Sequence, residues 1–369
     1  MRILVTGASG FIGSFIISEG LERGYEMWAG MRRTSSRQYL TDPRTHFAEL
    51  DLGNPTRLRE QLVALRAEMG GRAWDYVIHA AGATKSLKRE GFFRTNTEGT
   101  QNLVCALRDT DMMPQRFVFM SSLSIFGAIK ENGNDNVNGN GNDNGNDNGN
   151  DNGRGNDNGN GNLYPDITED DTPRPNTAYG ESKLAAEEWL RQQDDLPWVI
   201  LRPTGVYGPR ERDYFLMAKS IGQHIDFAVG YKPQEITFVY VMDVVQAAFL
   251  ACERPAADVL HRSYFLSDGM SYNSRAFSDL LQKEMGIRGV LHIKAPLWFL
   301  RAVCTVNGAI CRRLGKLTTL NMDKYHILAQ RNWNCDIEPA RRELGYEPQW
   351  SLADGVRKSV RWYKQQGWL

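Results

Sequence analysis

The sequence has few cysteines and no excess of either charge. Its 369 residues include five cysteines, an odd number with none of the Cys-x-x-Cys spacing of metal sites and redox pairs. We therefore expect no metal, no disulfide framework and a cytoplasmic location, where thiols stay reduced. Lysine plus arginine and aspartate plus glutamate each number 44, so the formal net charge is zero. This balance predicts neither nucleic acid nor an anionic membrane as the main partner.

Long hydrophobic runs are also scarce. The most apolar late stretch, residues 296–311, is interrupted by Arg301 and Asn307. It is shorter than the roughly 20 residues that span a bilayer, so we expect no stable membrane insertion. We interpret it as a packed helix, with a position on a membrane surface as the less favoured alternative. The first residues run directly into a strand-like pattern, which predicts no signal peptide.

Short apolar runs alternate with helical patterns through the first half of the chain. Strand patterns cover residues 2–5, 26–31, 45–49, 76–79 and 116–120, and helical patterns cover 11–23, 56–68 and 97–109. A further helix at 179–192 and a strand at 198–202 follow. This alternation predicts an α/β fold, a doubly wound parallel Rossmann sheet whose ligands bind at the carboxyl ends of the strands.

The turn after the first strand has the spacing of a dinucleotide-binding loop. Residues 6–13 read Thr-Gly-Ala-Ser-Gly-Phe-Ile-Gly and open the first helix. The first glycine permits a tight turn, the second lets the backbone approach a pyrophosphate, and the third lets helix and sheet come close. Free N–H groups at the helix start then bind the phosphates. The predicted cofactor contacts here are Gly7, Ser9, Gly10, Phe11, Ile12 and Gly13.

The end of the second strand favours NADP over NAD. An NAD site usually has a carboxylate here for the ribose 2′-hydroxyl, whereas this chain has Arg32 and Arg33. A guanidinium binds a 2′-phosphate through two parallel hydrogen bonds, so we predict NADP, with NAD as the alternative. Further along, Asp51 and Leu52 are placed to meet the adenine. Small residues after the fourth strand, Ala80, Ala81 and Gly82, would let the backbone lie against the cofactor.

A tyrosine and a lysine stand four residues apart on a predicted helix. This spacing puts Tyr179 and Lys183 on one face. A nearby ammonium lowers the pKa of a phenol, so Tyr179 is predicted to exchange a proton with an alcohol or carbonyl oxygen. Ser122 follows the strand at 116–120, where its hydroxyl would bind the same oxygen, with Ser124 beside it on the substrate side.

These motifs, taken in order, resemble those of the extended short-chain dehydrogenases/reductases, also called the NAD-dependent epimerase/dehydratase family. The matching segments are residues 6–13, 121–127, 179–183, 201–209, 238–244 and 344–348. The resemblance implies that Ser122, Tyr179 and Lys183 are catalytic, that Tyr179 and Lys183 also contact the cofactor, and that Lys183 binds the nicotinamide ribose. It places Asn96 near the cofactor and Pro203 to Val206 beside the nicotinamide, and it suggests a homodimer by analogy.

A tract at residues 132–162 consists almost entirely of asparagine, glycine and aspartate. A segment of this composition buries too little apolar surface to offset the conformational entropy lost on ordering, so we predict a disordered insertion. Its spacing does not match known calcium-binding loops. Removing its 31 residues from the 57 positions between Ser122 and Tyr179 leaves 26, close to the spacing in the resembling family. The predicted division is therefore a Rossmann core at 1–131 and 163–210, with 211–369 mainly substrate-binding and returning one strand and one helix to the core.

Three functions stay open at this stage. Leu123 and Ser124 stand where dehydratases of the family carry acidic residues, which disfavours a dehydratase. We favour an oxidoreductase that transfers hydride at an alcohol/carbonyl centre of a small molecule. A nucleotide-sugar epimerase with tightly bound NAD is the alternative, with Arg210 and Arg212 available for a diphosphate. A cofactor-sensing protein without catalysis is the third possibility.

Overall fold

A seven-stranded parallel sheet forms the centre of the protein. The structure, a computed structural model, describes residues 1–131, 162–315, 318 and 320–369, so the predicted insertion lies outside the described residues except for Asn162. The strands are β1 (Arg2–Thr6), β2 (Glu26–Met31), β3 (His46–Glu49), β4 (Tyr76–His79), β5 (Arg116–Met120), β6 (Trp198–Pro203) and β11 (Arg262–Leu266). Their order is β11-β6-β5-β4-β1-β2-β3. The order reverses between β1 and β4, which opens a crevice at the carboxyl ends of these strands.

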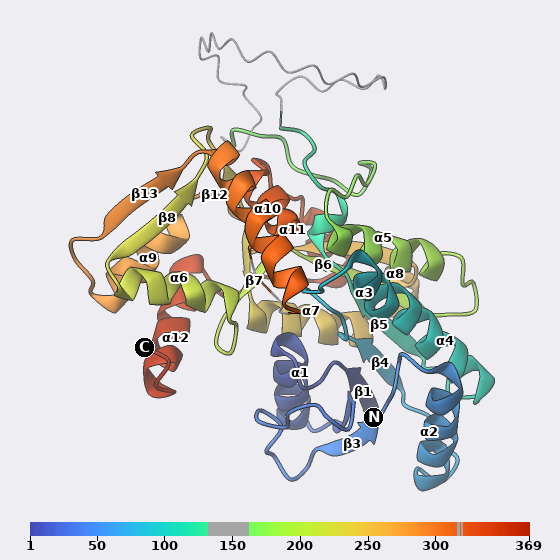
Figure 1. Ribbon diagram of the computed structural model, residues 1–369. Coiled ribbons are helices and arrows are strands. Elements are labelled where there is room, and N and C mark those ends of the chain that lie inside the picture. Colours follow the sequence, from blue (N-terminus) through green and yellow to red (C-terminus); the bar gives the residue numbers. More distant parts are fainter. Residues whose placement is uncertain (132–161, 316–317, 319) are drawn as a thin grey trace.

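Helices cover both faces of this sheet (Figure 1). One face packs against α1 (Phe11–Glu22) and α7 (Val241–Glu253), and the other against α2 (Pro55–Glu68), α4 (Gly99–Asp109) and α5 (Ala178–Leu190). In α2, Leu58, Leu62 and Leu65 lie on one buried face, and Asn54 caps the helix by accepting from the Arg57 N–H. The predicted Rossmann fold is thus confirmed, including the positions of its first five strands.

A smaller lobe stands beside the carboxyl edge of the sheet. Its short strands and helices come from the second half of the chain. They are β7 (Gly205–Tyr207), α6 (Asp213–Gly222), β8 (Ile225–Val229), β9 (Glu235–Ile236), β10 (Phe238–Tyr240), β12 (Tyr272–Asn273), α9 (Ala276–Met285), β13 (Leu291–Ala295) and α12 (Leu352–Gln365). By contrast, α3 (Arg89–Phe93) packs against α5, and α8 (Ala256–Val259) buries Val259 in the core on the α7 side of the sheet. Tyr207, Phe238 and Phe277 centre its core, against which Trp350, Trp362 and Trp368 pack. The C-terminal region is therefore ordered, as its aromatic content indicates.

The stretch predicted as a packed helix is helical, but it is covered on one side only. In α10 (Leu297–Arg313), Leu300 and Cys304 are buried, whereas Trp298, Val306 and Ile310 are exposed. The covered side faces α11 (Met322–Ala329). The expectation of a packed helix therefore holds on one side only. Apolar residues occur all around this helix, and composition does not reveal how many neighbouring elements cover it. Among the described residues, no helix is long and apolar enough to cross a membrane.

Candidate active site

The glycine-rich loop is pressed against the chain that leaves β4. Gly7 has a φ of +70°, and a Cβ there would come within 2.7 Å of the Ala80 backbone. A Cβ on Gly13 would collide with the Gly7 carbonyl oxygen, so the first turn of α1 also requires glycine. The Gly10 N–H donates to the Gly7 carbonyl at 2.9 Å, which closes the turn. The loop therefore presents bare backbone at the start of α1, the geometry that binds phosphate groups.

A cavity of about 670 Å³ opens at this loop, in the crevice between β1 and β4. Nine predicted cofactor residues line it, namely Gly7, Ser9, Gly10, Arg32, Asp51, Leu52, Ala80, Ala81 and Gly82. The predicted residues that do not line it are Phe11, Ile12, Gly13, Arg33, Asn96, Tyr179, Lys183, Pro203 and Val206. Phe11 and Ile12 pack against the smaller lobe, and Arg33 is exposed. The cavity thus corresponds in size and place to the adenosine and diphosphate part of a dinucleotide site.

The end of β2 carries cationic and hydroxyl groups. Gly30, Met31, Arg32 and Ser35 line the cavity there, and Asp51 is the only carboxylate among the described residues that line it. The Asp51 carboxylate accepts from the Gly53 N–H at 3.3 Å and lies 3.9 Å from the Arg57 guanidinium. Asp51 therefore already has partners. Arg32 at the end of β2 and Arg94 between α3 and α4 are exposed cations that line the cavity, and Arg32 is the one at the strand end where a 2′-phosphate would bind.

The predicted catalytic residues lie where β5 ends and α5 begins. Ser122 follows β5, and Tyr179 and Lys183 lie in the first two turns of α5. Thr177 caps α5 by accepting from the Gly180 N–H at 3.0 Å, which fixes the helix start next to Tyr179. The Ser122 Oγ accepts from the Ser124 N–H at 3.2 Å and from the Ser124 hydroxyl at 2.9 Å. Ser124 therefore orients Ser122, and the Ser122 side chain is near enough to Tyr179 to lower the pKa of its phenol.

The pKa values of the catalytic pair follow burial. Burial raises the pKa of Tyr179 to about 12, against the opposing interaction with Ser122. Burial also lowers the pKa of Lys183 to about 8, against the opposing charge of Glu187. The expectation that Lys183 lowers the Tyr179 pKa was wrong for the protein alone. The Lys183 ammonium donates instead to the Met120 carbonyl at 2.7 Å and lies 4.6 Å from the Phe119 ring centroid, so the desolvation of the phenol decides the direction.

Asn96 links the cofactor loop to the catalytic helix. It is completely buried in the π-helical segment Arg94–Glu98. Its side-chain carbonyl accepts from the Ala83 N–H at 2.7 Å, and its amide donates to the Ala83 carbonyl and to the Ser182 hydroxyl. Asn96 thus positions both segments rather than lining the large cavity. A π-helical turn at such a residue is typical of functional sites.

Sequence reasoning missed a buried histidine beneath the loop. His79 Nδ1 lies 2.6 Å from the Thr6 hydroxyl, and Nε2 lies 2.9 Å from the Thr100 hydroxyl. Because the Thr100 hydroxyl already donates to the Asn96 carbonyl, Nε2 must carry the proton and Nδ1 must accept. Burial lowers the pKa of His79 to about 3, so the ring is neutral. A histidine ending an apolar strand was the available signal.

A buried carboxylate, Glu187, favours the charged form of Lys183. Glu187, one turn after Lys183, accepts from the Arg202 guanidinium at 2.6 and 3.1 Å, and Arg202 also pairs with Glu169. The ion pair lowers the pKa of Glu187 despite its burial, whereas the burial of Glu169 raises its pKa to about 7. Sequence reasoning found the segment of Arg202 but not this pairing.

Two further cavities, each of about 400 Å³, adjoin the catalytic helix. Residues from α3, α5, α10 and α11 line the first, and the second shares Asn176, Met322 and His326 with it. The first is lined by Phe92, whose ring meets Tyr179 edge to face at 6.4 Å. These cavities are the candidate substrate site. Arg210, expected to grip a substrate, lines neither cavity.

The Arg210 guanidinium is committed to another part of the fold. It donates to the Ser14 hydroxyl at 2.8 Å and lies over the rings of Phe15 and Tyr39, at 4.1 and 4.6 Å from their centroids. These contacts join the segment after β7 to the outer side of α1. The assignment of Arg210 to the substrate therefore finds no support in its surroundings, and its contacts are those of a packing residue.

The fold and this arrangement of loop, cavity and Ser-Tyr-Lys set define a nicotinamide-dependent enzyme. The model of the NAD dependent epimerase/dehydratase family matches residues 3–146 and 157–266, so the chain belongs to this family. The prediction of an oxidoreductase or epimerase of this kind is thereby confirmed. The match omits residues 147–156, which fall within the predicted insertion.

Curated relatives match along nearly the whole chain. The 2-alkyl-3-oxoalkanoate reductase of Stenotrophomonas maltophilia (strain K279a) is 27% identical, over 97% of this chain and 98% of its own. The 3-beta-hydroxysteroid dehydrogenase of Mycolicibacterium neoaurum is 25% identical, over 98% and 91%. Among solved structures, the dTDP-glucose 4,6-dehydratase of Streptomyces venezuelae, with NAD and TYD bound, is similar at a TM-score of 0.72 and 22% identity, over 100% and 98%. Its likeness concerns the fold.

Proposed function

We propose that the protein is an NADP-dependent reductase/dehydrogenase that interconverts a carbonyl and an alcohol on an apolar small molecule. The strongest support is that Tyr179 lies beside Ser122 and against Phe92 of the candidate substrate cavity, while the Lys183 ammonium lies 3.3 Å from the position that a Cβ on Gly82 of the dinucleotide cavity would take. Membership of the family fixes the cofactor class but not the substrate.

In the proposed mechanism, the hydroxyls of Ser122 and Tyr179 hold the reacting oxygen. Tyr179 gives its proton to that oxygen during reduction and takes it back during oxidation. Lys183 binds the ribose and keeps a positive charge near the phenol, and Glu187 supports that charge from below. The bound cofactor supplies or accepts the hydride. Ser124 acts through Ser122, whose hydroxyl it orients at 2.9 Å.

The preference for NADP rests on Arg32. Its side chain is exposed at the cavity edge, where a 2′-phosphate would accept two charge-assisted hydrogen bonds. Ser35 lines the same edge and adds a hydroxyl donor. Arg33 does not line the cavity, so we assign the phosphate to Arg32 alone.

The apolar character of the substrate is inferred from the cavity that Phe92 lines and from the relatives. Leu87, Phe92 and Met322 give this cavity an apolar part beside the catalytic helix, while charged residues such as Arg89 and Asp323 also line it, so the relatives carry more of the inference. The two reported relatives are named for a 2-alkyl-3-oxoalkanoate and a 3-beta-hydroxysteroid, both rich in hydrocarbon. A cavity of about 400 Å³ that continues into another of the same size can receive a long or bulky apolar molecule.

Steady oxidation of NADPH in the presence of 2-alkyl-3-oxoalkanoates or 3-oxosteroids would test this function. Loss of that activity in Tyr179→Phe would attribute it to the proposed site. An epimerase of nucleotide sugars would instead retain NAD through purification, which native mass spectrometry detects. The commitment of Arg210 to Ser14, Phe15 and Tyr39 disfavours that alternative, because it removes one of the two cations considered for a sugar diphosphate. A cofactor-sensing protein would bind NADPH and turn over none of these compounds.

A further inference from the structure

The outer side of α10 exposes an unusual amount of hydrocarbon. Trp298 is 72% exposed, Val306 59% and Ile310 52%, and Phe299 next to Trp298 is about half exposed. Trp298, Val306 and Ile310 lie eight and four positions apart and so share one face of the helix, with Phe299 beside Trp298 at its edge. The opposite face, with Leu300 and Cys304, is buried, which means that the exposed residues belong to an ordered, packed helix.

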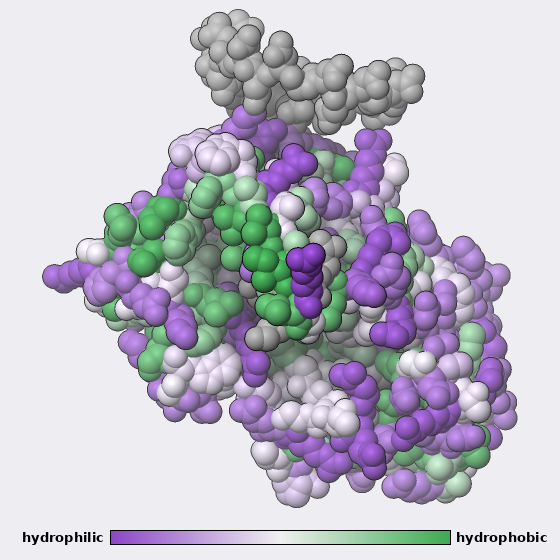
Figure 2. All heavy atoms as spheres, in the orientation of Figure 1, coloured by the Kyte–Doolittle hydropathy of each residue, from purple (hydrophilic) through white to green (hydrophobic). Residues whose placement is uncertain are grey.

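The β8–β13 pair extends this apolar surface. Phe227, Leu291 and Tyr231 are each more than half exposed, and Figure 2 shows apolar residues gathered over this pair and over α10 on one face of the molecule. We call the exposed apolar residues of α10 and of the β8–β13 pair the apolar face. Singly exposed apolar residues are ordinary, but a gathered set of large ones marks an interaction site.

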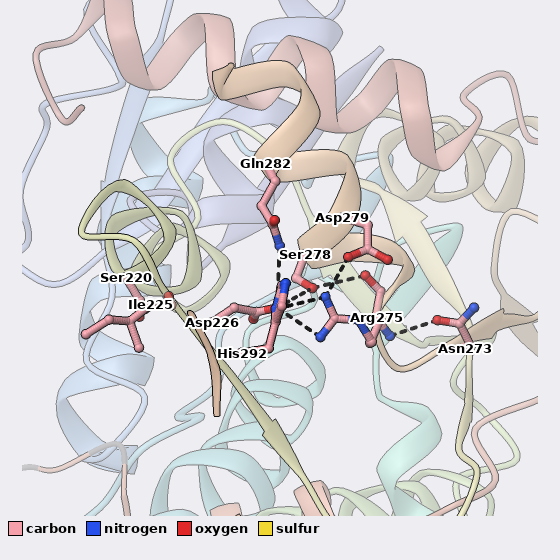
Figure 3. Close-up of polar contacts among 9 residues, drawn as sticks. All are labelled: Ser220, Ile225, Asp226, Asn273, Arg275, Ser278, Asp279, Gln282 and His292. Carbon is pink, nitrogen blue, oxygen red and sulfur yellow. Dashed lines mark hydrogen bonds and ion pairs between the residues drawn. The ribbon is translucent and has the colours of Figure 1, made fainter. Parts of the chain in front are cut away.

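A buried carboxylate holds the β8–β13 pair in place. Asp226 of β8 accepts from Ser278 at 3.1 Å, and its carboxylate lies 3.3 Å from the Arg275 guanidinium and 3.1 Å from His292 Nδ1 (Figure 3). These contacts join β8 to β13 and α9. The side chains of the pair that point outward are therefore held there by a fixed scaffold.

The charge around the apolar face has one sign. Residues 285–322 contain six lysines and arginines and no aspartate or glutamate, in a chain that otherwise balances its charges. Arg288, Lys294, Arg301 and Arg313 are exposed. Within the described part of the chain, none of these four forms an ion pair with a carboxylate. The zero net charge of the whole chain therefore conceals a local cationic region. The overall balance of charge does not reveal whether this region could bind an anionic surface.

We propose that the apolar face docks on the surface of an anionic lipid bilayer, with α10 lying in the plane of the interface. Tryptophan and tyrosine side chains favour the interfacial zone, and arginine stems can lie along hydrocarbon while their charged ends reach lipid phosphates. A helix with an apolar side and basic residues binds anionic membranes in this way. A second copy of the chain fits less well, because it would bring two cationic regions together without counter-charges.

Docking would also bring the candidate substrate cavity to the membrane. The inner side of α10 lines that cavity through Cys304, Thr305, Gly308 and Cys311. The same helix would thus contact lipid on one side and border the cavity on the other. The docking proposal itself stands on the apolar face and its charge, whatever the enzyme reduces.

Flotation of the purified full chain with vesicles tests the docking. We expect binding to vesicles of phosphatidylcholine mixed with phosphatidylglycerol, weaker binding at high salt, and little binding to phosphatidylcholine alone. The variant Arg301→Gln/Arg313→Gln should weaken binding by roughly 10- to 30-fold. Trp298→Ser/Ile310→Ser should weaken it by roughly 10-fold or more, because two large apolar side chains no longer enter the interface.

Matched controls separate the face from general surface effects. Val63→Ser removes an exposed apolar residue from α2, and Arg361→Gln/Lys364→Gln removes two exposed charges from α12. Both should bind vesicles as the wild type does. No binding to phosphatidylglycerol vesicles, or equal weakening by controls and test variants, would overturn the proposal. A solution dimer that Trp298→Ser/Ile310→Ser converts to a monomer would also overturn it and assign the face to a second copy.

Brominated phosphatidylglycerol gives an independent readout on correctly folded protein. Bromine atoms in the acyl chains should quench a part of the tryptophan emission of the wild type. That quenched part should disappear in Trp298→Phe, which keeps an apolar ring at the same position. Unchanged quenching in Trp298→Phe would contradict an interfacial position of α10.

Discussion

The Asn96 amide donates to the Ser182 hydroxyl at 2.8 Å, across 86 positions of the chain. The same side chain forms both hydrogen bonds with the Ala83 backbone, in the loop that borders the dinucleotide cavity. One buried side chain therefore sets the distance between the cofactor loop and the helix that carries Tyr179 and Lys183. Hydride and proton transfer both depend on that distance, because reacting atoms must approach to about 3–3.5 Å.

Replacing Asn96 by alanine should impair positioning as well as stability. Three hydrogen bonds would be lost, one to the buried Ser182 and two to the partly buried Ala83 backbone, and we expect the free energy of unfolding to fall by about 2–4 kcal/mol. We expect kcat to fall by at least about 10-fold while the KM for the substrate changes less. Asn102→Ala is the control: Asn102 donates a single bond to the Leu52 carbonyl at 2.9 Å. It should lose stability and keep its kcat; an equal loss of kcat in both variants would contradict a positioning role for Asn96.

Removing the phenol oxygen of Tyr179 should abolish proton exchange without disturbing the dinucleotide cavity. In Tyr179→Phe we expect turnover to fall by about two to four orders of magnitude. The dissociation constant for NADPH, measured by fluorescence titration, should stay within a few-fold, since Tyr179 does not line that cavity. Tyr325→Phe removes a phenol oxygen from the lining of one candidate substrate cavity and should reduce turnover far less, which makes it the tyrosine control. Retention of near wild-type turnover in Tyr179→Phe would refute the assigned acid/base.

Arg32 should distinguish the two nicotinamide cofactors. In Arg32→Gln the charge-assisted hydrogen bonds to the 2′-phosphate are lost, which should raise the Kd for NADP by roughly 10- to 100-fold. The Kd for NAD should change little. Arg33→Gln alters the neighbouring charge, which does not line the cavity, and should leave both constants nearly unchanged. Calorimetric titration of the three proteins with both cofactors would decide; equal affinity of the wild type for NADP and NAD would refute the preference.

The local patterns of the sequence were sufficient for the sheet and the phosphate loop. Each strand of the first half is a short apolar run, and Gly7 and Gly13 are required where the backbone approaches most closely. The contacts that cross the fold were not readable. Nothing near Asn96 indicates that Ser182 is its partner, and nothing near Arg210 indicates Tyr39. Such pairings depend on how distant elements pack, whereas a strand or a glycine turn is decided by its own few residues.

The same limit explains one wrong expectation about environment and one that holds only in part. The spacing of Tyr179 and Lys183 places them on one helix face, but their pKa values depend on how deeply the fold buries each group. The apolar content of α10 predicted a helix correctly, yet only the arrangement of its neighbours leaves Trp298 and Ile310 exposed. In both cases the sequence pattern predicts the helix, whereas the burial of each side chain depends on how the helix packs in the tertiary structure.

His79 should make the fold sensitive to acid. Its folded pKa is about 3, whereas an unfolded histidine has a pKa of about 6.5, so between these values the unfolded chain binds more protons. Stability from this group is therefore present above pH 6.5 and lost as the pH falls. From pH 7.5 to 5.5 we expect the free energy of unfolding of the wild type to drop by about 1.4 kcal/mol relative to His79→Gln. Urea unfolding of both proteins at the two pH values measures this difference directly.

The His46→Gln variant removes an exposed ring instead and should keep the full pH dependence of the wild type. Parallel pH curves for the wild type and His79→Gln would mean that protonation of His79 carries no cost, which would contradict the neutral ring bound between Thr6 and Thr100.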